Sequence, residues 1–139
     1  MYLRLKLATT AHLLAAALGI AVLTAPAGPR AEAAAQPILV KVHADWCQTC
    51  TRLEPTWRRI EAEYGDRVRM VVFDVTDRGS LESSRENARR LGLSELFDDV
   101  KSSTGTIAVL RPNREPVRIF KGVLDYAVYE AAIREADAS

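Results

Sequence analysis

Beyond residue 36, short and nearly continuous apolar runs alternate with longer segments whose apolar residues recur at helical spacing. The β-branched run Ile38–Val42 predicts a strand buried on both faces, and Val68–Val75 predicts a second strand of the same kind. Thr106–Leu110 and Val117–Phe120 predict two further strands. Because Pro and Asn lie in the five-residue connection between them, we expect these two strands to form a hairpin.

The segment Cys47–Tyr64 predicts a helix, because its apolar residues recur every three or four positions. Gly65 is expected to end it, and Pro55 is expected to kink it because proline removes one backbone hydrogen bond. The residues that form its apolar side are Leu53, Trp57, Ile60 and Tyr64.

Two more helices follow. Ser80–Leu91 is expected to begin with Ser80 as its N-cap and to stop at Gly92, and Asp125 is expected to cap a last helix that runs through Ala136. The predicted order is β-α-β-α-β-β-α. We therefore expect an α/β fold in which a central mixed sheet is flanked by helices.

The first 35 residues have a different pattern. Arg4 and Lys6 precede the uncharged stretch Leu7–Ala27, and an Ala-rich run ends at Ala35. A basic start, an apolar centre and small residues at the exit predict a secretory signal peptide, cleaved after Ala35, with Ala33 as the alternative position. An uncleaved membrane anchor is the alternative, since such a stretch is long enough to span a bilayer. In both cases residues 36–139 form the domain, in the periplasm or another extracytoplasmic compartment.

Charge and length exclude several classes of function. The chain has 139 residues and a formal net charge of +1, which becomes −1 when residues 1–35, with three basic residues and one acidic residue, are removed. This balance gives no support to binding of nucleic acid or of an anionic membrane surface. The length is that of a single small domain.

Both cysteines lie in one motif, Cys47-Gln48-Thr49-Cys50, directly after the first predicted strand. Because β-α-β crossovers are right-handed, the following helix starts at the edge of the sheet where α/β proteins place their chemistry. Cysteines three positions apart on a helix can form a disulfide. The free N–H groups of the helix start favour the thiolate of Cys47, and Cys50 is expected to be the less exposed, resolving thiol.

Two other interpretations of this motif are weaker. A structural disulfide across so short a loop removes little entropy from the unfolded chain. A zinc site needs two further ligands, and His43 is the only histidine after residue 35, so cysteine and histidine from one copy cannot complete it. Redox chemistry without a cofactor is therefore the preferred interpretation.

The run Ile38–Cys50 resembles the first strand and the Trp-Cys-Gly-Pro-Cys site of thioredoxins, and Pro55 and the Phe120-Lys121-Gly122 run resemble their helix-kinking Pro and closing strand. Over residues 37–136 the chain is thus identified as thioredoxin-like. The resemblance implies a thioredoxin-like fold, with Cys47 as the attacking cysteine and Cys50 as the resolving cysteine. It also implies Trp46 as the aromatic residue of the substrate groove, and Gln48 and Thr49 as the dipeptide that tunes the reduction potential.

One departure from the family concerns the loop before the third strand. The family usually has a cis-Pro there, whereas Ser103–Thr106 contains no proline, and Thr104 or Gly105 takes its place. In the family this loop binds substrate backbone and shields the thiols. Its change therefore affects substrate binding and, by family experience, access of metal to the cysteines.

Two charged features depart as well. Lys41 stands where cytoplasmic thioredoxins carry a buried Asp, and it shares a strand face with Leu39 and His43. Such a lysine must reach solvent, pair with an acid or have a lowered pKa, and we expect it to reach solvent at the strand end. The connection Leu93–Ser103 is long, and we expect a short acidic helix beside the active-site edge, with Glu95, Asp98 and Asp99.

His43 replaces an aromatic residue common near this site. It could carry a proton or act as a third metal ligand, but we expect it to pack as an aromatic-sized side chain.

These observations predict an exported thiol-disulfide oxidoreductase that acts on protein disulfides, with reduction favoured over oxidation as its direction. The resemblance implies a membrane thiol reductase as electron donor. A metal-binding or redox-inactive interaction module of the same fold is the alternative, which the missing proline and Lys41 favour.

Overall fold

The computed structural model describes residues 36–138, so the predicted signal peptide lies outside the described residues. Within this range no helix is both long and apolar enough to cross a bilayer. The elements, in chain order, are β1 (Ile38–His43), α1 (Gln48–Tyr64), β2 (Arg69–Asp74), α2 (Arg78–Leu91), α3 (Ser94–Val100), β3 (Thr106–Leu110), β4 (Pro116–Lys121) and α4 (Tyr126–Asp137).

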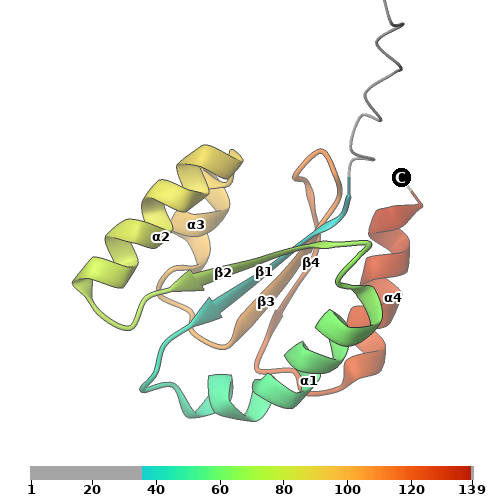
Figure 1. Cartoon of the computed structure of the whole chain (residues 1–139), viewed down its shortest axis with the longest axis horizontal. Coiled ribbons are helices and arrows are strands. Elements are labelled where there is room, and N and C mark those ends of the chain that lie inside the picture. The colour runs from blue at the N-terminus through green and yellow to red at the C-terminus, as the bar shows by residue number, and fades with distance from the viewer. Residues whose placement is uncertain (1–35, 139) are drawn as a thin grey trace, which may run out of the picture. The chain divides into compact units, whose positions relative to one another are not determined.

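The four strands form one mixed sheet in the order β2-β1-β3-β4. β1 is parallel to β2 and antiparallel to β3, and β3 and β4 form the predicted antiparallel hairpin. Helices α1 and α4 lie on one face of the sheet, and α2 and α3 lie on the other (Figure 1). The predicted α/β architecture is confirmed, and the carboxyl end of central strand β1 leads directly into the CxxC motif.

Strand β1 alternates between the two layers, as its sequence predicts. Leu39 packs in the core cluster with residues of α1 and α4. Ile38, Val40 and Val42 pack in the second cluster, with residues of α2 and α3. Since side chains two apart share a face, Lys41 follows Leu39 onto the α1 side, where it meets Glu54 of α1.

Two local predictions were wrong. β2 is half exposed, with Val72 at 42% exposure, because it is an edge strand and not a strand buried on both faces. The N-cap of α2 is Asp77, whose Oδ1 accepts the N–H of Ser80 at 2.8 Å, so Ser80 is the bonded residue and not the cap. Gly92 ends α2 as predicted, in the left-handed conformation (φ 68°).

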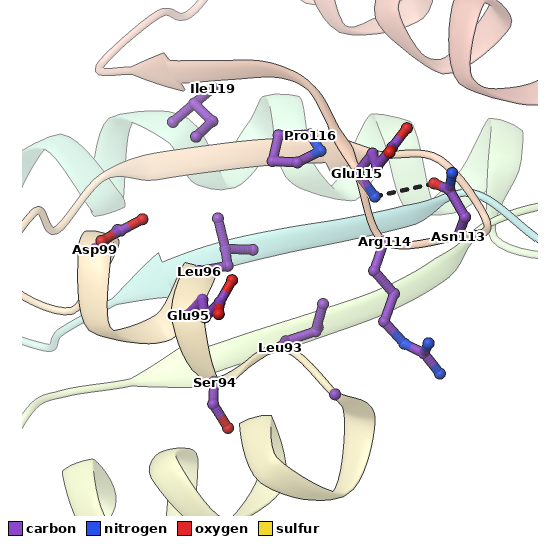
Figure 2. A pocket seen from close by; sticks show the side chains of 11 residues that line it. Leu93, Ser94, Glu95, Leu96, Asp99, Asn113, Arg114, Glu115, Pro116 and Ile119 are labelled. Atoms are coloured by element: carbon purple, nitrogen blue, oxygen red, sulfur yellow. Dashed lines mark hydrogen bonds between the residues drawn. The ribbon is translucent and has the colours of Figure 1, made fainter.

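The long connection before β3 does form a short helix, α3, which adds one element to the predicted order. Figure 2 shows Glu95 and Asp99 beside a cavity of about 650 Å³ that α3 shares with the β3–β4 hairpin. Asp98 pairs with Lys101 at the end of α3. The acidic side chains therefore line the hairpin cavity or bind a neighbouring lysine, while the end of α3 leads into the loop that contacts the CxxC motif.

Candidate active site

Cys47 is the N-cap of α1. Its backbone is extended (φ −90°, ψ 104°), and its Sγ accepts the backbone N–H of Cys50 at 3.1 Å. A turn connects β1 to this position, and in it the Cys47 N–H donates to the Ala44 carbonyl with an N–O distance of 3.0 Å. The first reactive thiol therefore lies at the unsatisfied N–H groups of a helix start, as the sequence predicts.

The two thiols, both free in this structure, have opposite shifts of pKa. For Cys47 burial is the largest influence and raises the pKa, but hydrogen bonds from the Cys50 thiol, the Thr104 hydroxyl and backbone N–H groups together outweigh it and lower the pKa. For Cys50 burial and the hydrogen bond to Cys47 raise the pKa. Cys47 is also the more exposed, at 7% against 2%. Cys47 is therefore the better nucleophile and Cys50 the protected thiol.

The loop that lacks proline packs on the CxxC dipeptide. Gly105 has φ 77°, donates its N–H to the Val42 carbonyl at 3.0 Å and accepts the N–H of Gly122 at 2.9 Å. A Cβ on Gly105 would lie 2.7 Å from Cγ2 of Thr49. The neighbouring Thr104 hydroxyl bonds to Cys47. Both candidate residues of this loop therefore contact the motif, through Thr49 and through Cys47.

Trp46 lies over the β2–α2 connection. Its Nε1–H donates to the Thr76 carbonyl at 3.0 Å, and the Asp45 N–H donates to the Thr76 hydroxyl, also at 3.0 Å. The indole is nevertheless 65% exposed. Gln48 is exposed and Thr49 is half-buried. The motif thus presents an anchored, exposed aromatic side chain next to Cys47.

Lys41 does not reach solvent, so that expectation is wrong. Only 7% of its side chain is exposed; Nζ lies 3.0 Å from Oε2 of Glu54 and 4.8 Å from the ring centre of Trp57. The physical reason is that α1 covers the middle of β1 and places the carboxylate of Glu54 next to the Lys41 ammonium. Arg58 holds the second oxygen of Glu54 at 3.2 Å. Hydrogen bonding to Lys41, the largest influence, and then to Arg58 lowers the pKa of Glu54 against the opposing effect of burial.

His43 lies at the end of β1 on the same face. Its Nε2 is 3.2 Å from Oδ1 of Asp45, while its Nδ1 is buried without a hydrogen-bond partner in the described part of the chain. His43 and Cys50 line a cavity of about 370 Å³, together with Lys41, Thr51, Glu54 and Val72. Among residues 36–138 no group of three or more His, Cys, Asp and Glu side chains is placed to hold a metal ion.

Comparison with known proteins agrees with this geometry. The family model Thioredoxin matches residues 30–87. The chloroplast thioredoxin-like protein HCF164 of Arabidopsis thaliana is 42% identical over 55 residues, which cover 38% of this chain and 21% of that protein. Thioredoxin of Acidithiobacillus ferridurans is 36% identical over 42 residues, which cover 30% of this chain and 39% of that protein. The family-model match, which includes the CxxC motif, and these relatives show that the chain is similar to thioredoxin-like proteins.

Solved structures show the same fold. A thioredoxin-like protein in its oxidised form superposes with a TM-score of 0.51 at 14% identity, over 74% of this chain and 78% of that one. A DsbF homologue from Corynebacterium diphtheriae superposes with a TM-score of 0.54 at 15% identity, over 73% and 72%. The matched segment spans only about a fifth of the chloroplast relative's length.

Two contributors to this thioredoxin-like site escaped the sequence analysis, namely Glu54 and Thr76. Glu54 lies one helical turn after Cys50, a spacing that places it on the same side of α1 and above Lys41. Thr76 anchors Trp46 from a loop thirty residues away, and no local signal in the sequence marks that contact.

Proposed function

We propose that this thioredoxin-like protein is an exported thiol-disulfide oxidoreductase that reduces disulfides in protein substrates. The observation that carries the proposal is the Cys47 thiol, which caps α1, has a lowered pKa and hydrogen-bonds to Cys50. A family member with such a pair has a nucleophile and a resolving thiol in contact.

In the proposed reaction, the Cys47 thiolate attacks one sulfur of the substrate disulfide. A bond forms between Cys47 and that sulfur, and the other substrate sulfur leaves as a thiolate and takes up a proton. Cys50 then loses its proton and attacks Cys47 Sγ, which releases the second substrate thiol. Two electrons pass to the substrate, and the protein is left with a Cys47–Cys50 disulfide.

A new cycle needs an electron donor, for which we propose a membrane thiol reductase in the same extracytoplasmic compartment. The proposed compartment rests on the signal-like pattern of residues 1–35. Some of the similar proteins are chloroplast proteins. The proposal therefore also includes the equivalent compartment of a chloroplast. The proposed substrate groove is bordered by Trp46, which leaves most of its indole free for contact.

Reduction of insulin disulfides by dithiothreitol, with and without the purified protein, tests the activity. Wild type is expected to accelerate the reaction and Cys47→Ser to abolish the acceleration. Cys50→Ser is the matched variant, because it retains the attacking thiol and should accumulate a mixed disulfide with the substrate. If wild type is no faster than Cys47→Ser, the oxidoreductase proposal is wrong and the redox-inactive module of the same fold takes its place.

A further inference from the structure

In the described part of the chain, one nitrogen of the His43 imidazole has a hydrogen-bond partner and the other has none. Nε2 lies 3.2 Å from the Asp45 carboxylate, which can only accept a hydrogen bond when ionised, so Nε2 carries the proton. In the neutral imidazole, Nδ1 is then the acceptor nitrogen, and it is buried without a partner in the part of the chain that the structure describes. The ring is therefore oriented with its proton acceptor away from bulk solvent.

The His43 side chain that carries this acceptor lines a cavity that also reaches the resolving cysteine. His43 and Cys50 both line a space of about 370 Å³ between β1, β2 and α1. One water occupies roughly 30 Å³ in the liquid, so the space can hold a water between the His43 and Cys50 side chains. The Cys50 thiol donates to the Val42 carbonyl with a sulfur–oxygen distance of 3.6 Å, and a backbone carbonyl cannot take up the proton.

The other ionisable groups that face His43 are poorer acceptors. The ammonium of Lys41 on β1 is a donor. Both oxygens of Glu54 on α1 are engaged by basic side chains, and its pKa is lowered. Asp74, the register partner of His43 on β2, accepts the Thr76 N–H at 2.8 Å through Oδ1. Asp45 is bound to Nε2 of the ring itself and is 79% exposed.

We propose that Nδ1 of His43 accepts the proton of Cys50 during the resolving step, an inference that rests on the proposed oxidoreductase function. The Cys50 S–H bond breaks and the proton passes to Nδ1, directly or through one water. The sulfur's electron pair forms the bond to Cys47, and the bond between Cys47 and the substrate sulfur breaks, so the substrate leaves as a thiolate. The imidazolium, stabilised by Asp45, then returns its proton to that thiolate or to solvent.

The reaction of the fully reduced protein with the aromatic disulfide dithiobis-nitrobenzoate separates the two thiols in time. Attack by Cys47 releases the first coloured thiolate, and attack by Cys50 on the resulting mixed disulfide releases the second. His43→Gln should leave the first phase within twofold of wild type and slow the second phase at least tenfold near neutral pH, since positioned bases contribute about 10²–10⁴-fold. The second phase of His43→Gln should also rise tenfold per pH unit, because its rate then follows the thiolate fraction of Cys50.

Two further variants keep the test independent of folding. Asp45→Asn changes an exposed side chain. It should also slow the second phase, but by a smaller factor than His43→Gln does. Ile119→Ala truncates a half-exposed side chain on β4, outside this cavity, and should change neither phase by more than twofold.

The inference is overturned if His43→Gln has the second-phase rate and pH slope of wild type, or if Glu54→Gln loses the second phase while His43→Gln retains it. A wild-type protein that releases only one equivalent of coloured thiolate contradicts the oxidoreductase proposal itself, and with it the role of His43. The two failures are thus distinguishable in one experiment.

Discussion

The Sγ atom of Cys47 accepts the backbone N–H of Cys50 at 3.1 Å, so the nucleophile of this protein is also the cap of its active-site helix. A thiolate satisfies that N–H better than a neutral thiol does, because hydrogen bonds to a charged acceptor are stronger. The same contact therefore stabilises the helix start and the reactive form of Cys47. Formation of a mixed disulfide removes the charge and weakens the cap.

The opposite pKa shifts predict the order of alkylation. Because folding lowers the pKa of Cys47, its thiolate persists at pH values where an ordinary thiol is protonated. The rate of iodoacetamide modification, followed against pH with the site identified by mass spectrometry, should extend to lower pH for Cys47 than for the urea-unfolded protein. Cys50, whose pKa is raised, should react only at higher pH. Modification of Cys50 first, or identical profiles in folded and unfolded protein, would contradict this assignment.

The Lys41–Glu54 pair predicts an asymmetry between two substitutions. Glu54→Gln leaves the buried ammonium of Lys41 without its counter-charge and should lower the free energy of unfolding by about 1–3 kcal/mol, less than for a fully buried pair because Glu54 is 37% exposed. Lys41→Met removes the charge that needs pairing and should change it by less than about 1 kcal/mol. Urea unfolding at neutral pH measures both. Equal losses in the two variants would show that packing, and not the uncompensated charge, governs this site.

The same pair has a pH signature. The pKa of Glu54 is lower in the folded protein, so the unfolded chain binds the proton more readily. Its contribution to stability is present above the unfolded pKa and is lost as pH falls through the lowered folded value. Wild type should therefore lose more stability than Glu54→Gln between about pH 5 and pH 3, as measured by urea midpoints. Parallel curves for the two proteins would contradict the sign.

Gly105 predicts that the family's proline cannot simply be restored. Gly105→Pro demands φ near −65° where the loop has 77°, and it removes the N–H that bonds to Val42. Gly105→Ala costs about 1–2 kcal/mol for its left-handed backbone, plus the clash with Thr49. Both variants should have a lower melting temperature, with Gly105→Pro the lower. The double variant Gly105→Ala/Thr49→Ala should regain part of the lost stability, because it removes Cγ2 of Thr49. An unchanged melting temperature in Gly105→Pro would contradict the left-handed backbone of this loop.

Trp46 predicts a separation between large and small substrates. Trp46→Ala removes an exposed indole from beside Cys47, so KM for insulin reduction should rise several-fold while the first phase with dithiobis-nitrobenzoate stays within about twofold. Ile119→Ala, which truncates a half-exposed side chain on β4, is the matched control and should leave both unchanged. An equal effect of the two substitutions on KM would remove Trp46 from the substrate groove.

Local sequence patterns predicted those parts of the fold in which an element's own sequence favours a single structure. The β-branched run of β1 and the helical spacing of Leu53, Trp57 and Ile60 on α1 each favour one packing, and both elements form as expected. Gly92 stops α2 because few other residues adopt its left-handed backbone. The CxxC motif, which is a local signal, also placed the two thiols correctly at the helix start.

The remaining features depend on which elements become neighbours. Val68–Val75 and Ile38–Val42 look alike in sequence, but only the second lies in the middle of the sheet. Lys41 depends on Glu54, thirteen positions away, and Trp46 depends on Thr76, thirty positions away. Asp77 and Ser80 are both good N-cap residues, so propensity alone could not choose between them.

The reduction potential of the Cys47–Cys50 couple tests the central claim most directly. Purified protein is equilibrated in glutathione buffers, trapped by alkylation and analysed by mass spectrometry. We predict a single two-electron transition, absent in Cys47→Ser and in Cys50→Ser, with a potential closer to the roughly −270 mV of thioredoxin than to the roughly −120 mV of a strong dithiol oxidant. A protein that shows no transition, or one whose potential lies near the oxidant value, would contradict the account of this protein as a reductant.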